Sequence, residues 1–427
     1  MGNYSSSDYL GRIIGSVLFV VLINKINRLL LLVLTLILKA ITLIIPFIFM
    51  HSLTFDSNSK TLYYICLICR FASGISQVYY TIYLPVWCDQ YGKKSSNTIM
   101  IMLIQLGLPA GIVLGYGIET LIDKWEVSFL IQGIICCIIA FFMLSFPLLY
   151  FSFDLVLVDG TDNEMTSTTQ NDDPLKQFEH RSSLCSNICQ IIKEKVYLLT
   201  GFSNSVVFFG MAVVQFWVTV YMEEVLGLSG EKHQTTVFII FASVCVTSPP
   251  IGVLVGGLVG SKLGGYTNKR ATLLCVLFAF MSCIFGIGVG YLDTTWHVGF
   301  AIGLWLYFFF VSAMSPLQTG IIISSLPEKL RGDGFSIMNI FLNAFGNLPG
   351  AAVYGWIYEK YKGQQIALRA TMFYNIFGLF CMILGMMFRY RKGNNMDNID
   401  DINDMEYEET TKGNPHGEML PSETFSE

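Results

Sequence analysis

Lys39 and Arg70 are positively charged side chains that lie inside long apolar runs of the sequence. A charge at the depth of a lipid bilayer is costly, so such a side chain normally faces the protein interior or an aqueous cavity. There it can bind an anionic group of a solute, pair with a carboxylate, or donate hydrogen bonds to backbone carbonyls. Arg70 is the first candidate for a solute contact and Lys39 is the second.

Amide and aromatic side chains occur in the other apolar runs. Amides can donate and accept hydrogen bonds toward a solute, although most amides in membrane helices join neighbouring helices. Aromatic side chains in such runs either line a cavity or belong to the core and the interfacial belt. The candidate cavity residues of these two kinds are Gln77, Tyr80, Gln105, Asn204, Gln215, Gln318 and Asn343, with Gln132 and Asn339 as further amides.

The sequence argues against several other kinds of chemistry. All 5 histidines fall outside the interior of the apolar runs, and no Gly-x-Ser-x-Gly elbow is present, so we predict no catalytic residue and no enzyme. Most of the 11 cysteines lie inside apolar runs, where they are small packing residues. We therefore expect no disulfide framework, no metal site and no cofactor. No basic footprint for nucleic acid is present.

The elements that must position these residues are membrane helices. Hydrophobic residues make up 53% of the 427 residues and charged residues 13%, and runs of the ~20 apolar residues that cross a bilayer recur about eleven times. Barrel strands would alternate in hydropathy instead. The sequence therefore predicts an all-α polytopic integral membrane protein. The runs cover 8–23, 29–50, 62–87, 98–121 and 127–152, and then 197–223, 235–262, 271–292, 297–325, 335–358 and 369–390.

One stretch occurs twice, as LPVWCDQYGKKSSNTIMIMLIQLGLPAG from Leu84 and as LPEKLRGDGFSIMNIFLNAFGNLPGA from Leu326. A repeat at this distance indicates two homologous halves. Five runs precede the polar centre of the chain and six follow it, so we expect the first half to lack its first helix. The predicted organisation is an N-terminal half-bundle over 1–152, a flexible linker over 153–195, a C-terminal half-bundle over 196–391 and a disordered acidic tail over 392–427.

Lysines and arginines of the short loops fall into two alternating sets, and the larger set should face the cytoplasm. That places the linker and the tail in the cytoplasm and the N-terminus on the other side of an unidentified membrane. Two basic loops belong to the larger set. The first contains Asn24, Lys25 and Arg28, and the second contains Ser261, Lys262 and Gly264.

These two loops resemble the G-x-x-x-(D/N)-(R/K)-x-G-(R/K) loop signature of the major facilitator superfamily. The first copy has Val20 in place of the first Gly and Asn27 in place of the second, while the second copy has Ser261 in place of Asp and Gly265 in place of the last cation. Arg70 lies four residues before Gly74, as in the fourth helix of this superfamily. The segment ICRFASGISQVYYTIYLPVW that contains both residues is similar to the Spinster-like branch.

The resemblance implies two six-helix halves that rock around a central cavity, with the substrate between them. It implies transport of a small organic solute or a lipid by alternating access, either facilitative or coupled to a proton. The sequence shows no carboxylate at the middle of a span, so the coupling stays open. The alternative is a receptor or scaffold that descends from transporters and no longer transports, which the missing helix and the degenerate loops favour.

Overall fold

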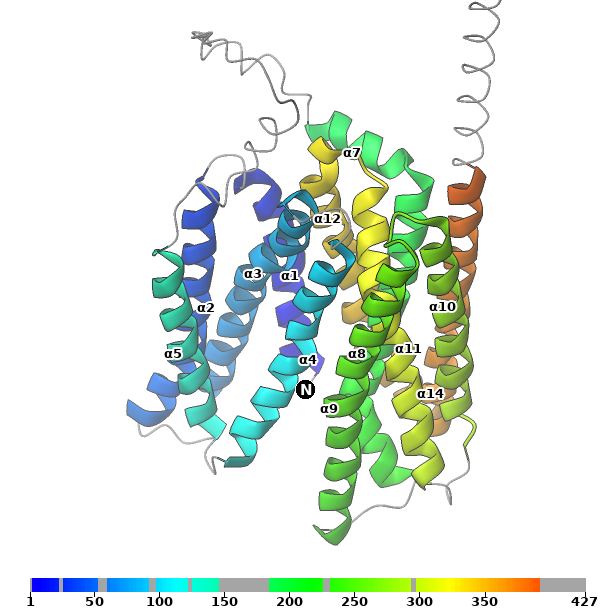
Figure 1. The fold of residues 1–427 in the computed structure, drawn as a ribbon. Helices are drawn as coiled ribbons and strands as arrows, with labels where there is room; N and C mark the ends of the chain where they lie inside the picture. The colour runs from blue at the N-terminus through cyan, green and yellow to red at the C-terminus, as the bar shows by residue number, and fades with distance from the viewer. Residues whose placement is uncertain are drawn as a thin grey trace, which may run out of the picture.

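The chain is described by a computed structural model that covers residues 2–22, 26–52, 60–91, 97–121, 125–145, 184–225, 231–292 and 297–391, and the regular elements in these ranges are all helical. Five helices form an N half on one side of the molecule (Figure 1). They are α1 (Gly2–Leu22), α2 (Arg28–Ser52), α3 (Lys60–Tyr91), α4 (Asn97–Leu121) and α5 (Trp125–Met143).

The other helices form a C half beside the first (Figure 1). They are the short α7 (Leu184–Lys193), followed by α8 (Lys195–Glu224), α9 (Glu231–Lys262), α10 (Lys269–Val289), α11 (His297–Ser324), α12 (Arg331–Phe341), α13 (Leu348–Tyr361) and α14 (Gln364–Met372). A π-helical turn over Leu342–Asn347 joins α12 to α13, and a last helical segment covers 374–391. The helix α7 lies inside the range that the sequence assigned to the linker.

Each predicted span overlaps described helix, which confirms the all-α polytopic fold class. Seven of the described helices are long and apolar enough to cross a membrane. Local signals set several of the helix ends. The Asn268 side chain accepts a hydrogen bond from the backbone N–H of Arg270 at 3.0 Å and caps the start of α10. At the end of α9, Gly264 and Gly265 have φ of 97° and 77°, the left-handed conformation that ends a helix at low cost when the residue is glycine.

The two halves are built by the same packing scheme. In the N half α1 packs along α3, and α3 packs along α2; in the C half α9 packs along α11, and α11 packs along α10. In both halves the first of these pairs meets at glycines. A Cβ at Gly15 would lie 2.9 Å from the backbone oxygen of Ile75, and a Cβ at Gly256 would lie 2.6 Å from the backbone carbon of Ala313. Such close approach is typical of membrane helices.

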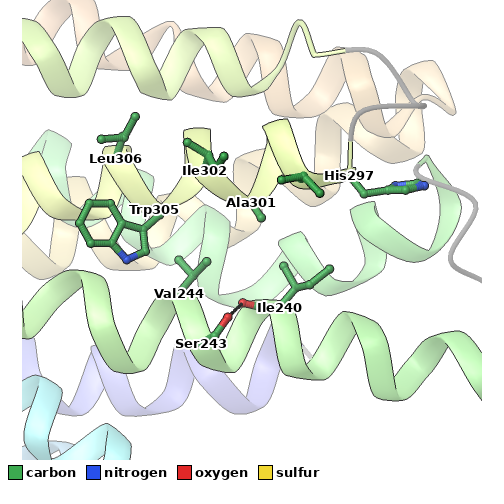
Figure 2. Close-up of a pocket in the computed structure, with 9 residues that line it drawn as sticks. Ile240, Ser243, Val244, His297, Ala301, Ile302, Trp305 and Leu306 are labelled. Carbon is green, nitrogen blue, oxygen red and sulfur yellow. Dashed lines mark hydrogen bonds between the residues drawn. The ribbon is translucent and has the colours of Figure 1, made fainter.

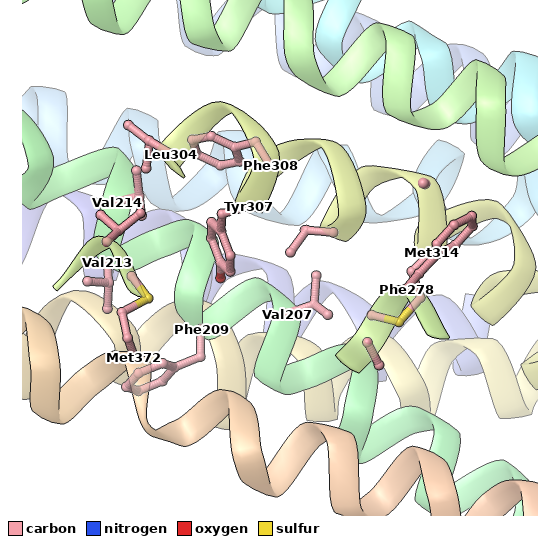
Figure 3. Packing of buried hydrophobic residues seen from close by; sticks show 14 of the residues in the cluster. Val207, Phe209, Val213, Val214, Phe278, Leu304, Tyr307, Phe308, Met314 and Met372 are labelled. Atoms are coloured by element: carbon pink, nitrogen blue, oxygen red, sulfur yellow. The ribbon is translucent and has the colours of Figure 1, made fainter. Parts of the chain in front are cut away.

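The largest apolar core lies in the C half, between α8, α11 and the helices around them. Figure 3 shows Val207, Val213 and Val214 of α8 near Leu304 and Tyr307 of α11, and Phe209 of α8 beside Met372 of α14. All these side chains are buried. The helix α8 also packs against the π-helical turn, α13 and α14. It is therefore a central helix of the C half.

In the C half, α8 packs against α13. A Cβ at Gly350 would lie 2.7 Å from the backbone oxygen of Phe209 on α8. The repeat aligns Gly350 with Ala110 of α4, whose side chain is exposed. A Cβ added at its neighbour Gly111 would meet no atom within 4 Å. The face of α4 that corresponds to the α8-facing side of α13 is therefore uncovered by the residues that the structure describes.

Candidate functional site

One face of α3 carries polar side chains on three successive turns, at Arg70, Ser73 and Gln77. Residues three and four apart lie on the same face of a helix. The helices α1 and α2 both pack against α3, and each brings a cation to this face. We call the group formed by Asp8, Arg12, Lys39, Arg70, Ser73 and Gln77 the charged cluster.

The helix α1 contributes Arg12 and Asp8 to the charged cluster. The Arg12 guanidinium is 2.7 Å from the Asp8 carboxylate one turn away, and it donates a hydrogen bond to Oε1 of Gln77 at 3.2 Å. Asp8 is 9% exposed. The ion pair lies against α3 because Gly74 has no side chain there, and a Cβ at Gly74 would lie 3.1 Å from the backbone nitrogen of Arg12.

The helix α2 contributes Lys39, whose ammonium donates a hydrogen bond to the Ser73 hydroxyl at 2.5 Å. The charges of Asp8, Arg12 and Arg70 all act on this ammonium. Lys39 is therefore held beside α3 by a neutral partner. Asp8, the carboxylate whose charge acts on Lys39, is at the same time paired with Arg12.

The same face of α1 reaches the C half one turn further along the helix. Ser16 follows Arg12 by four residues and accepts a hydrogen bond from Nδ2 of Asn339, on α12, at 2.9 Å. The amide of Asn343 donates in turn to the backbone oxygen of Asn339 at 2.8 Å, and Asn347 donates to Oδ1 of Asn343 at 3.1 Å. This ladder runs along the π-helical turn, a feature that is frequent at functional sites. The charged cluster thus lies next to the boundary between the halves.

A second polar contact between the halves involves Gln105 of α4. Its Nε2 donates to Oγ1 of Thr319, on α11, at 2.5 Å, and its Oε1 accepts from the hydroxyl of Ser315. Gln105 is one of the predicted cavity residues. In this conformation the amide is occupied by the contact between α4 and α11.

An ion pair joins the halves at the end of the bundle where α3, α9 and α11 end. Asp89, on α3, forms an ion pair of 2.5 Å with Arg331, the first residue of α12. The Asp89 carboxylate also accepts a hydrogen bond from the Tyr266 hydroxyl. Asn97 at the start of α4 donates to the same hydroxyl at 3.4 Å. We call Asp89, Tyr266 and Arg331 the latch.

The loop after α9 positions Tyr266 in the latch. Gly264 and Gly265 turn the chain back at the end of α9, and Arg389 donates to the backbone oxygen of Tyr266 at 2.8 Å. Burial raises the pKa of the Tyr266 phenol, and the adjacent Asp89 carboxylate raises that pKa further. The phenol therefore keeps its proton and remains a hydrogen-bond donor to Asp89 at neutral pH.

The remaining predicted site residues lie in different surroundings. Tyr80 is half-buried on α3, where the charges of Arg12 and Asp8 act on it. Gln318 is fully buried and donates to Ser203 of α8 at 3.1 Å, and Asn204 is buried beside Ser203. Gln215, by contrast, is exposed on α8.

The structure describes the second of the two basic loop motifs more completely than the first. Asn24 and Lys25 lie outside the described residues, and Arg28 begins α2. Ser261 and Lys262 end α9, and Gly264 forms the turn that carries Tyr266. The second loop thus supports the latch, while the first is described only from Ile26 onward.

An apolar pocket of about 480 Å³ lies between α9 and α11. Figure 2 shows Ile240 and Val244 of α9 facing Ala301, Ile302 and Trp305 of α11 across it. Val298, which also lines the pocket, is 73% exposed and Ile302 is 55% exposed. An exposed apolar surface of this kind suits contact with lipid. None of the predicted cavity residues lines this pocket.

Six residues of these two groups are not among the predicted site residues: Asp8, Arg12, Ser73, Asp89, Tyr266 and Arg331. Asp8 lies at the outer end of the first predicted span, and Arg12 follows it in the same apolar stretch. Asp89 and Arg331 lie at a span end and in a basic loop, where charge signals topology rather than contact. An arginine inside a span, four residues after an aspartate, is a signal that could have identified the Asp8–Arg12 pair.

Comparisons with known proteins agree with this architecture. The Major Facilitator Superfamily profile matches residues 1–351. A comparison with curated protein sequences found no match. Among solved structures, the fold is similar to the E. coli fucose:proton symporter FucP, with a TM-score of 0.63, 13% identity and coverage of 90% of each chain. It is also similar to the proton:xylose symporter XylE, with a TM-score of 0.64, 14% identity and coverage of 91% of this chain and 85% of that one. The chain therefore belongs to the Major Facilitator Superfamily and is a multi-pass integral membrane transporter.

Proposed function

We propose that this protein carries a small solute across the membrane by alternating access, with the charged cluster as part of the solute site. The observation that carries the proposal is the arrangement of polar contacts between the halves. The latch joins them at one end of the bundle, and the charged cluster lies at their boundary further from that end. Opening the latch would let the halves rock about this boundary. As a transporter of this superfamily, the chain is not an enzyme.

We further propose that the latch faces the cytoplasm. The latch end of the bundle carries the basic residues Arg28, Lys262, Lys269, Arg331 and Arg389. An excess of lysine and arginine in short loops marks the cytoplasmic side. On this assignment the structure is the state in which the cytoplasmic side is closed. The assignment to the Spinster-like branch remains a proposal that rests on the residues around Arg70.

The uncovered face of α4 supports the proposal that the N half lacks a counterpart of α8. If that position stays empty, Ala110→Leu should leave the melting temperature of the purified protein unchanged within about 1 °C, because an exposed substitution usually changes stability little. Gly350→Leu at the equivalent position should destabilise the protein by about 2 kcal/mol, because its side chain would enter the contact with α8. Equal losses of stability in both variants would show that a helix covers α4 as well.

Uptake into liposomes tests the carrier function. Purified protein in liposomes is exposed to a pooled set of radiolabelled metabolites, and accumulation above protein-free liposomes is expected for at least one of them. Arg12→Gln should abolish that accumulation, because it removes the cation that joins Asp8 to Gln77. Lys360→Gln, at an exposed site on α13, should not affect it. Folded protein that accumulates no solute would favour the receptor or scaffold alternative.

A further inference from the structure

The charged cluster contains more hydrogen-bond donors than acceptors. Arg12 Nε is buried and has no hydrogen-bond partner among the described residues, although the Arg12 guanidinium binds Asp8 and Gln77 through Nη2. The Lys39 ammonium has three N–H donors, and the hydrogen bond that the described residues give it goes to Ser73. A buried donor without an acceptor is costly. These donors therefore require an acceptor that the described side chains do not supply.

The net charge of the cluster indicates which kind of acceptor is missing. Asp8 is the carboxylate that acts on Lys39, whereas Arg12 and Arg70 act on it as cations. Asp8 is already engaged by Arg12 at 2.7 Å. Even without Arg70, the group formed by Asp8, Arg12 and Lys39 carries a net positive charge. Positive charge at membrane depth is stabilised by an opposite charge, so the missing acceptor is an anion.

The position of the donors fits a solute that binds between the halves. Arg12 and Ser16 lie one turn apart on one face of α1, and Ser16 is bonded to Asn339 of the C half. Lys39 reaches the same face of α3 through Ser73, which is four residues from the Gln77 that binds Arg12. The charge of Arg12 also acts on Tyr80, whose side chain is half-buried. The aromatic ring of Tyr80 offers an apolar surface for the carbon part of a solute.

We infer that the transported solute is an oxyanion, with carboxylate or phosphate oxygens that accept hydrogen bonds from Arg12 and Lys39. Guanidinium and ammonium groups bind such oxygens with short, charge-assisted hydrogen bonds. That the oxyanion is transported, and not only bound, rests on the proposed carrier function. The binding of the oxyanion itself rests only on the charged cluster.

The test measures binding apart from transport. The full chain in phosphatidylcholine nanodiscs is titrated by calorimetry with inorganic phosphate, acetate and succinate, and with uncharged mannitol as the neutral probe. At least one of the anions should bind and mannitol should not. Phosphate binding without carboxylate binding would assign the site to phosphoryl compounds, and the reverse would assign it to carboxylates.

Variants then assign the binding to the cluster. Lys39→Met should weaken anion binding at least ~10-fold, which corresponds to about 1.4 kcal/mol. Lys39→Arg should retain most of the binding, because it keeps the charge. Lys360→Met, an exposed control on α13, should bind as the wild type does. The melting temperature of each variant shows whether it is folded.

The outcomes separate this inference from the carrier function. If folded protein binds none of the three anions, or if folded Lys39→Met binds them as tightly as the wild type, the oxyanion site is wrong even if liposomes accumulate a neutral solute. If anions bind in a manner that depends on Lys39 but no solute accumulates in liposomes, the carrier function fails and the oxyanion site stands.

Discussion

Asp89→Asn is expected to open the latch end of the bundle. The substitution leaves Arg331 without its partner at 2.5 Å, in a pair whose side chains are 17% exposed at Arg331 and 5% exposed at Asp89. Removing one partner of a buried ion pair costs about 3 kcal/mol or more. The cost falls on the closed state, because an opened latch exposes Arg331 to water. The population of the closed state relative to the open state should therefore fall by about 100-fold.

Hydrogen–deuterium exchange measures this opening directly. Backbone amides of the segment over 260–270, which contains Tyr266, should exchange faster in Asp89→Asn than in the wild type. Glu328→Gln is the matched control. Glu328 lies 3.8 Å from the same Arg331 but its side chain is 75% exposed, and exposed pairs contribute little. If Asp89→Asn and Glu328→Gln exchange equally, the latch does not hold the halves together.

Gly256→Leu should strongly destabilise the folded protein. A Cβ at this position would lie 2.6 Å from the backbone carbon of Ala313 and 2.7 Å from its Cα. The obstacle is backbone, which cannot move aside as a flexible side chain can. The helices α9 and α11 would have to separate along their length, at a cost of about 3 kcal/mol or more.

The control for this substitution is Gly288→Leu in α10. Gly288 is exposed, and a Cβ added there would meet no atom within 4 Å. Leucine also favours the helix by about 0.8 kcal/mol relative to glycine. The melting temperature in detergent should fall by many degrees for Gly256→Leu and should stay constant or rise for Gly288→Leu. A Gly256→Leu protein that melts with the wild type would contradict the close packing of α9 on α11.

The sequence predicted the architecture because its signals are local. Apolar runs of sufficient length mark membrane helices one at a time, and the repeated Leu-Pro stretches are visible without a structure. Arg70, Lys39, Gln77 and Tyr80 were also accessible in this way, since polar residues inside an apolar run are conspicuous. The shared face of Arg70 and Gln77 follows from their spacing of seven residues, once α3 is known to be a helix. The approach of Lys39, which lies on α2, to the same face depends on the packing of α2 against α3.

The contacts between distant segments could not be predicted in the same way. Asp89 and Arg331 are separated by 242 residues, and each lies at a helix end, where charges are ordinary. The exposure of Gln215 also escaped prediction, because α8 is apolar on nearly all sides and its sequence does not fix its rotation. The sequence placed Asp8 at the outer end of the first predicted span, whereas α1 begins at Gly2. Asp8 therefore lies in the second turn of the helix and not at its end.

The central claim is that the two halves rock against each other, and paired distances between them test it most directly. In a protein without native cysteines, spin labels at Ser145 and Arg270 report on the latch end, and labels at Lys60 and Tyr361 report on the opposite end; the four sites are exposed. Asp89→Asn should lengthen the first distance and shorten the second, as measured by double electron–electron resonance. Distances that stay unchanged at both ends, or that lengthen together, would contradict alternating access.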